Sequence, residues 1–101
     1  MEHLEYEFGP FAPAPGATNA LVGVVGSGNM EVLFEPRPLG GMMRFVIDTS
    51  ISGFDPTWRA VLETFAERHR VGDLLVTIND AGATPSVVAL RLAQAAEELG
   101  V

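Results

Sequence analysis

Apolar and polar residues alternate along much of the first half of the chain, with the period of two that is typical of half-buried strands. β-Branched and aromatic residues, which favour strands, dominate the apolar positions. In the first segment three apolar side chains share one face and two glutamates the other, and in the fourth every second residue shares the apolar face. The pattern predicts four strands, at Leu4–Phe8, Ala20–Val25, Met30–Glu35 and Met43–Ile51.

The second and third of these segments are joined by Gly26-Ser27-Gly28-Asn29. Glycine and asparagine tolerate the positive φ that tight turns need, so the two segments are predicted to form a β-hairpin. Ser27 would then lie at an exposed tip with no bulky neighbour on either side. Stretches rich in proline and glycine, residues 9–16 and 36–41, are predicted to be loops, because proline removes a ladder donor.

A helical period begins after residue 54. Asp55 is the expected N-cap, and Pro56 suits the first helical position. The next apolar residues recur at the i, i+3, i+4 and i+7 spacing of a helix that buries one face. We interpret this face as core, and Gly72 as the residue that ends the helix. The face comprises Trp58, Val61, Leu62 and Phe65.

Asp73–Asp80 is predicted to be a further strand that leads into a second helix. Thr84 is the expected N-cap of this helix, Pro85 its first residue, and Gly100 its end. Its predicted buried face comprises Val88, Leu92, Ala95, Ala96 and Leu99, while Arg91, Gln94, Glu97 and Glu98 are expected to point outward.

Strands mostly precede helices in this order, which predicts a single α+β domain over residues 1–101 with a small, mainly antiparallel sheet and two helices on one face. The sequence does not determine the order of the strands within the sheet.

Composition excludes several classes of site. The 101 residues include no cysteine, which rules out disulfides and thiolate chemistry, and the two histidines stand far apart, so no metal site is expected. A net charge of −7, with no lysine, argues against nucleic acid. The absence of a long apolar run or a basic, apolar N-terminus argues against a membrane or secretory segment, so a cytoplasmic location is expected.

Ser27 allows several interpretations. A nucleophilic serine would require a base and a strand-to-helix elbow, but here a strand follows and only His3 and His69 could serve as base. A phosphate cradle is equally poorly matched, because no helix begins after the glycines. A serine that another enzyme modifies needs only to be reachable, and this interpretation competes with that of an ordinary turn residue.

Asp80 and Thr84 flank Gly82 and could be catalytic. A strand-exit turn followed by a helix cap explains both residues better.

Two stretches together resemble the acyl carrier (delta, or C) subunit of malonate decarboxylase. The first runs from Ala20 to Pro36 and contains Val25-Gly26-Ser27-Gly28, and the second runs from Ile78 to Leu92 and contains Asp80-Ala81-Gly82-Ala83-Thr84-Pro85. The resemblance covers the chain from about residue 17 onward. It divides the chain into a strand plus loop at 1–16 and a family-like core at 17–101.

The resemblance implies a non-catalytic carrier. Ser27 would bear 2′-(5″-phosphoribosyl)-3′-dephospho-coenzyme A through a phosphodiester, with Gly26, Gly28 and Asn29 as the flanking loop. The thiol of this group would carry acetyl and malonyl. The implied partners are an acyltransferase subunit, the carboxy-lyase subunits and the nucleotidyltransferase that attaches the group.

An acidic surface that docks on basic partners would suit a carrier, and Asn29, Glu31 and Glu35 are the candidate contact residues near Ser27. Two alternatives stay open from the sequence: a carrier of the citrate lyase type, which uses the same kind of group, and an α+β interaction module without a cofactor.

Overall fold

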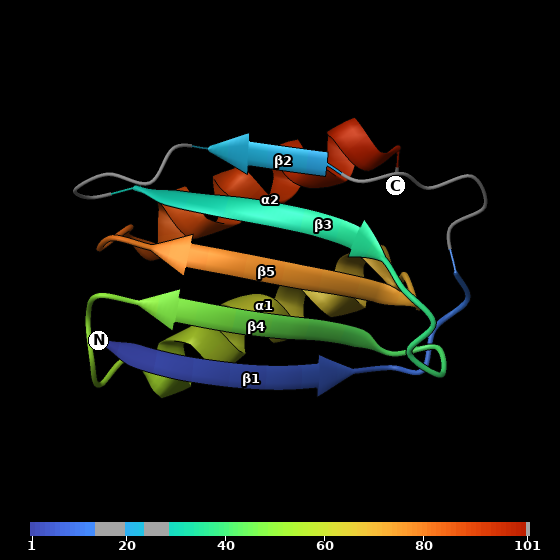
Figure 1. Ribbon diagram of the computed structural model, residues 1–101, viewed down its shortest axis with the longest axis horizontal. Coiled ribbons are helices and arrows are strands. Elements are labelled where there is room, and N and C mark those ends of the chain that lie inside the picture. The colour runs from blue at the N-terminus through green and yellow to red at the C-terminus, as the bar shows by residue number, and fades with distance from the viewer. Residues whose placement is uncertain (14–19, 24–28, 101) are drawn as a thin grey trace.

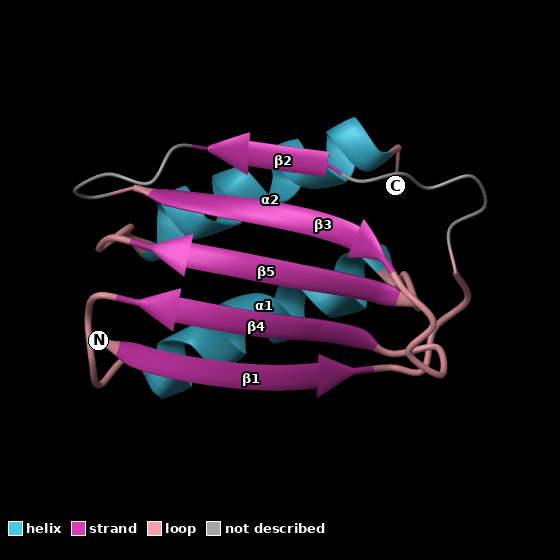
Figure 2. Cartoon of the chain, in the orientation of Figure 1, coloured by secondary structure: helices cyan, strands magenta, loops and turns pink. Residues whose placement is uncertain are grey.

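The computed structural model describes residues 1–13, 20–23 and 29–100, and shows a five-stranded sheet with two helices (Figure 1). Both helices lie on the same face of the sheet (Figure 2), so the predicted α+β class and layering are confirmed. The elements are β1 (Glu2–Phe8), β2 (Ala20–Gly23), β3 (Met30–Pro36), β4 (Met43–Thr49), α1 (Asp55–His69), β5 (Leu74–Asp80) and α2 (Pro85–Leu99).

The strand order is β1-β4-β5-β3-β2. All neighbouring pairs are antiparallel except β4 and β5, which are parallel. Because α1 connects β4 to β5, it carries the chain back to the end of the sheet where β4 began, and β5 then runs alongside β4. β5 thus occupies the centre of the sheet, between two strands that precede it in the sequence.

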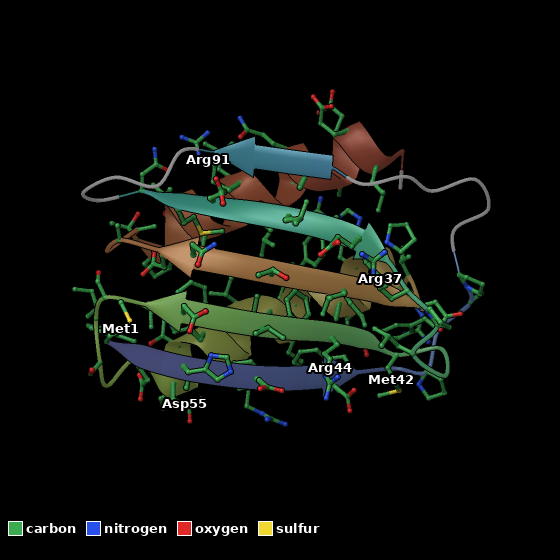
Figure 3. The ribbon with its side chains drawn as sticks, in the orientation of Figure 1. Met1, Arg37, Met42, Arg44, Asp55 and Arg91 are labelled. Atoms are coloured by element: carbon green, nitrogen blue, oxygen red, sulfur yellow. The ribbon has the colours of Figure 1, made fainter. Side chains whose placement is uncertain are left out.

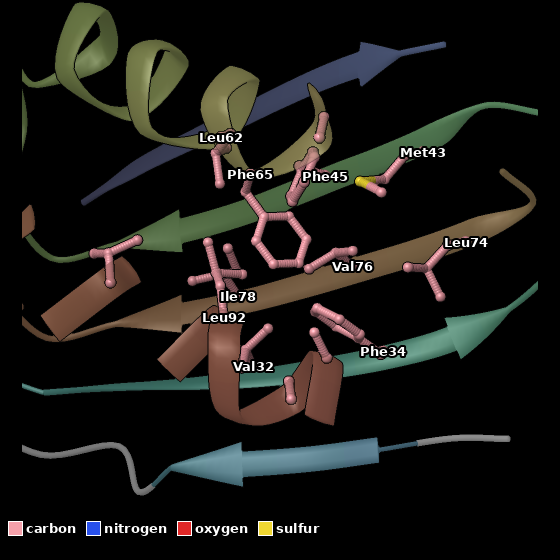
Figure 4. Close-up of a cluster of buried hydrophobic side chains, with 14 of the residues drawn as sticks. Val32, Phe34, Met43, Phe45, Leu62, Phe65, Leu74, Val76, Ile78 and Leu92 are labelled. Atoms are coloured by element: carbon pink, nitrogen blue, oxygen red, sulfur yellow. The ribbon is translucent and has the colours of Figure 1, made fainter. Parts of the chain in front are cut away.

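The core lies between the sheet and the two helices (Figure 4). Phe65 of α1 packs edge-on against Phe34 of β3 and Phe45 of β4, with ring centroids 5.9 and 6.4 Å apart. Leu92 of α2 is fully buried in the same cluster. The apolar faces predicted for β1, β3, β4 and both helices therefore meet in one layer. No helix of the described residues lies on the other face of the sheet.

Two predicted ends of α1 are wrong. Asp55 is the first helical residue, after an N-cap at Phe54 that makes no side-chain cap. The Asp55 carboxylate instead accepts a hydrogen bond from the Tyr6 hydroxyl of β1. Burial and this contact raise the pKa of Tyr6. Tertiary contact has thus replaced local capping, while the carboxylate still lies at the helix N-terminus, where it is favourable.

At its other end α1 stops at His69, with Arg70 in the left-handed conformation as the C-cap, so Gly72 is not the cap. Gly72 instead pairs with Pro13 in an isolated bridge. A Cβ atom there would lie 2.0 Å from the Phe11 carbonyl oxygen. Close backbone approach, and not helix termination, is therefore what requires this glycine.

β4 ends at Thr49, two residues earlier than predicted, and Ile51 lies beyond it with 41% of its surface exposed. α2 agrees with its prediction, because the Thr84 side chain accepts from the Val87 amide and Gly100 is a left-handed C-cap. Its five predicted core residues are all buried. None of the helices in the described part of the chain is long and apolar enough to cross a bilayer. The cytoplasmic location and the domain limits stay predictions.

Candidate functional site

The strand register brings Gly23, Met30, Thr49 and Asp80 to one end of the sheet, which we call the hairpin end. Gly23 is the last residue of β2, and β3 begins at Met30. β4 and β5 both finish at this end, and both helices begin near it (Figure 1). Gly26, Ser27 and Gly28 lie outside the described residues, so the exposure expected of Ser27 stays a prediction. The antiparallel pairing expected of the strands on either side is confirmed.

Asn29, the flanking residue that the structure does describe, is held by three hydrogen bonds. Its side-chain oxygen accepts from the Met30 amide at 2.8 Å and from Nε of Arg91 at 3.1 Å. Its backbone carbonyl accepts from the Ala81 amide at 2.9 Å. Asn29 therefore connects the start of β3 to both α2 and the turn after β5. This fixes the position of the chain two residues after Ser27.

Arg91 was missed as a site residue, because the helical period places it on the outward side of α2. The structure brings it against Asn29, 62 positions away in the sequence, where it lies half-buried. Its guanidinium also donates to the Gln94 side chain at 2.9 Å. Figure 3 shows Arg91 where β2 ends and β3 begins, with Arg37 at the opposite end of the sheet.

The charge of Arg91 has no acidic partner within ion-pair distance among residues 1–13, 20–23 and 29–100. By contrast, Arg37, Arg44 and Arg70 each lie within 4 Å of a glutamate carboxylate. In a chain with a net charge of −7, a cation thus remains at the hairpin end. Two of its donors are used by Asn29 and Gln94, and a guanidinium has further N–H groups that suit phosphate oxygens.

Asp80 organises the turn between β5 and α2. Its carboxylate accepts from the Thr49 hydroxyl at 2.8 Å, the Gly82 amide at 3.2 Å and the Ala83 amide at 2.9 Å. The carboxylate is buried, with 7% of the residue's surface exposed. The geometry agrees with the strand-exit turn inferred from the sequence. It also aligns the intervening Ala81 amide with Asn29.

Neither histidine lies beside Asn29 and the start of β3. His69 lies at the far end of α1 and stacks on Phe65, with ring centroids 4.3 Å apart, and burial and then Arg68 lower its pKa. His3 lies on β1, three strands away from β3, which is about 14 Å at the usual strand spacing. Hydrogen bonds to Asp48 and then Glu5 raise the pKa of His3. No cluster of three metal-ligating side chains occurs in the part of the chain that the structure describes.

Of the other residues predicted to contact partners, Glu31 and Glu35 alternate with the buried residues of β3 and so lie on the face of the sheet that carries no helix. Glu35 forms an ion pair with Arg37 at 2.5 Å. Asn29 is occupied by the hydrogen bonds described above. Its part in partner contact stays a prediction, as does that of the two glutamates.

Known proteins of one family match this chain in sequence and in fold. Residues 17–99 match the family model described as malonate decarboxylase delta subunit (MdcD). The chain is 53% identical over 100 residues to a malonate decarboxylase acyl carrier protein of Xanthomonas campestris pv. campestris, a match that covers 98% of this chain and 95% of the relative. A protein of the same name from Stenotrophomonas maltophilia is 52% identical, with 98% and 94% covered.

Among solved structures, the chain matches a chain in the crystal structure of a Pseudomonas malonate decarboxylase hetero-tetramer in complex with malonate. The TM-score is 0.87 at 44% identity, and the match covers 99% of this chain and 100% of the other. Of the two carrier families considered from the sequence, the comparisons support the first. The chain belongs to the malonate decarboxylase acyl carrier protein family.

Proposed function

We propose that this chain is the non-catalytic carrier subunit of a malonate decarboxylase. In this proposal Ser27 bears 2′-(5″-phosphoribosyl)-3′-dephospho-coenzyme A, which supplies a thiol for acetyl and malonyl groups. The single observation that carries the proposal is the family match over residues 17–99, a range that includes Gly26-Ser27-Gly28. The role of each residue below is part of the same proposal.

The charge at the hairpin end fits a group of this kind. A phosphodiester and its neighbouring phosphates are anions, and an acidic protein would repel them at most surface positions. Arg91 is a cation close to the attachment point along the chain, because its Nε lies 3.1 Å from the side-chain oxygen of Asn29, two residues from Ser27. We assign Arg91 the role of binding a phosphate of the attached arm.

The fold also gives the attachment point a firm base. β3 is paired on both sides, with β2 and β5, and Met30 at its start is fully buried. Asn29 adds contacts to α2 and to the turn after β5. The part of the chain that begins two residues after Ser27 is therefore fixed by contacts with β2, β5 and α2. A rigid base lets a tethered group meet partner sites at a high effective concentration without release.

The partners proposed are the acyltransferase subunit, the carboxy-lyase subunits and the nucleotidyltransferase that attaches the arm. The solved relative comes from a hetero-tetramer, which supports assembly with other subunits. The net charge of −7 favours docking on basic surfaces. Such binding should weaken as salt rises, and an affinity that is equal at low and high salt would contradict the electrostatic part of the proposal.

The decisive experiment is intact mass spectrometry after co-expression with the nucleotidyltransferase. We expect the mass of the chain to rise by that of one arm, and Ser27→Ala to abolish the gain. Ser52→Ala removes an exposed hydroxyl elsewhere in the chain and serves as the matched control, which should still be loaded. A bare polypeptide mass, under conditions where the transferase loads a known acceptor, would favour a cofactor-free interaction module instead.

A further inference from the structure

A cavity of about 420 Å³ opens at the hairpin end, between the first turns of α1 and α2. Its walls are mostly apolar, and Thr49 and Asp80 stand at the ends of the strands that border it. A mostly apolar pocket with a few polar groups is the usual form of a small-molecule site. The apolar lining includes Phe54, Trp58, Val61, Ala83, Pro85 and Val88.

Two of the large apolar side chains that line the cavity are not buried in the core. Phe54 and Ile51 line it while 51% and 41% of their surfaces remain exposed, although both are apolar. Trp58 lines it too, with only 6% exposed. An apolar occupant would remove the two exposed side chains from water, which is favourable.

The cavity lies beside Asn29, which is two residues from Ser27 along the chain. Asp80 and Gly82 line it, and Ala81 between them donates its amide to the Asn29 carbonyl at 2.9 Å. Consecutive Cα atoms are 3.8 Å apart, so the Cα atom of Ser27 lies within about 7.6 Å of that of Asn29. An arm that contains a nucleotide and a pantetheine chain is longer than this separation.

The charge of the cavity selects among possible occupants. The Asp80 carboxylate receives three hydrogen bonds, all from donors of the protein, which is the arrangement that suits an anion. The basic side chains of the described residues do not contribute to the lining. A neutral group can therefore enter, whereas a second carboxylate would be repelled by that of Asp80 and would meet no basic side chain among the described lining residues.

We propose that this cavity binds the acetyl thioester end of the chain's own arm and rejects the malonyl form; the inference rests on the proposed function. The walls shelter the neutral acetyl group from water between encounters. The free carboxylate of malonyl keeps the malonyl form outside, where a decarboxylating partner can reach it. The carrier thus distinguishes its two loads by charge, through Asp80 and the apolar walls.

Trp58 is the sole tryptophan of the chain and provides the test. Its emission is compared in the unloaded, acetyl-loaded and malonyl-loaded forms of the full chain, each verified by intact mass. We expect the emission spectrum to shift on acetyl loading and to shift at most one third as far on malonyl loading. The half-life of the acetyl thioester in water should fall at least threefold when the cavity is filled by Ala83→Leu.

Ala89→Leu makes the same change at an exposed position of α2 that does not line the cavity, and it should leave both readouts unchanged. Should Ala83→Leu fail to fold, nuclear Overhauser contacts between a ¹³C-labelled acetyl methyl and the Trp58 indole are measured in the unaltered chain instead. Their presence supports the proposal, and their absence overturns it.

Other outcomes separate the possible failures. Acetyl loading confirmed by mass, with a Trp58 emission that is unchanged or equal in both acyl forms, overturns this inference and leaves the carrier function standing. Emission that responds only when the acyltransferase subunit is added would assign the cavity to a partner's side chain, and likewise overturns it. A chain that gains no mass refutes the proposed function and the inference with it.

Discussion

Replacing Asp80 by alanine is expected to be one of the most destabilising single changes at the hairpin end. The carboxylate is 7% exposed and receives hydrogen bonds from Thr49, Gly82 and Ala83. A hydrogen bond to a charged group contributes about 1.5–3 kcal/mol, and a buried donor left without an acceptor costs about 1–3 kcal/mol.

The three losses do not simply add. The Thr49 hydroxyl keeps its contacts with the backbone of Ile51, so its loss is partial. Water in the adjoining cavity can reach some of the released donors. We therefore expect Asp80→Ala to lower the free energy of unfolding by about 3 kcal/mol, which is large beside the roughly 5–15 kcal/mol of a typical domain. The melting temperature should fall by more than about 10 °C.

The assay is urea denaturation followed by circular dichroism, with the midpoint and slope fitted for each variant. Asp80→Asn keeps one acceptor oxygen but turns its amide donors toward donors of the protein, so its effect should be intermediate. Asp48→Ala removes the same group from the face of the sheet without helices, where it is exposed, and should cost less than about 1 kcal/mol. An Asp80→Ala variant that stays within about 0.5 kcal/mol of the unaltered chain would refute this reasoning.

Three further predictions concern other parts of the molecule. Arg91→Ala should slow loading by the nucleotidyltransferase about tenfold or more, as followed by mass over time. Arg37→Ala makes the same charge change at the opposite end of the sheet and should have little effect. Equal slowing by both variants would contradict the phosphate-binding role of Arg91. Gly72→Ala should lower the free energy of unfolding, measured by urea denaturation, by about 1–3 kcal/mol, because its Cβ would lie 2.0 Å from the Phe11 carbonyl oxygen. An unchanged urea midpoint would show that the backbone segments at Gly72 and Phe11 can separate. The pKa of His3 is raised above its ordinary 6.5, so its stabilising effect is complete below that pH and is lost as pH rises through the raised value. His3→Gln should therefore lower the urea midpoint at about pH 5.5 and leave it unchanged at about pH 9, and an equal effect at both would exclude the charged imidazole as the cause.

The periodic elements of this fold could be predicted because their cause is local. The alternation of apolar residues in β3 and β4 predicts which side chains are buried, and so does the helical spacing in α2. The structure buries these side chains. The Thr84 cap and the Gly100 end of α2 were predictable for the same reason, since each depends on atoms within a few residues. The wrong assignments at the two ends of α1, Asp55 and Gly72, are places where a distant segment competes with the local signal.

The candidate site likewise has features that the sequence shows and contacts that only the structure shows. The turn sequence around Ser27 and the motif that begins at Asp80 were visible in the sequence, and they led to the family. The contact between Arg91 and Asn29 was not visible, because a helical period that exposes an arginine says nothing about which strand end lies beside it. The cavity was equally hidden, since it exists only where the first turns of α1 and α2 meet the ends of β4 and β5.

The sequence by itself determined the kinds of element and the faces they bury, because these follow from residue type and spacing along the chain. Its resemblance to a carrier family led to Ser27 as the expected attachment residue, which stays a prediction. The insertion of β5 between β3 and β4 was decided only by the tertiary structure. Many strand orders bury the same apolar faces, and the choice among them depends on how whole elements pack. That choice brings Asp80 to Met30 in the register, and with it the arginine, the asparagine and the cavity to one end of the sheet.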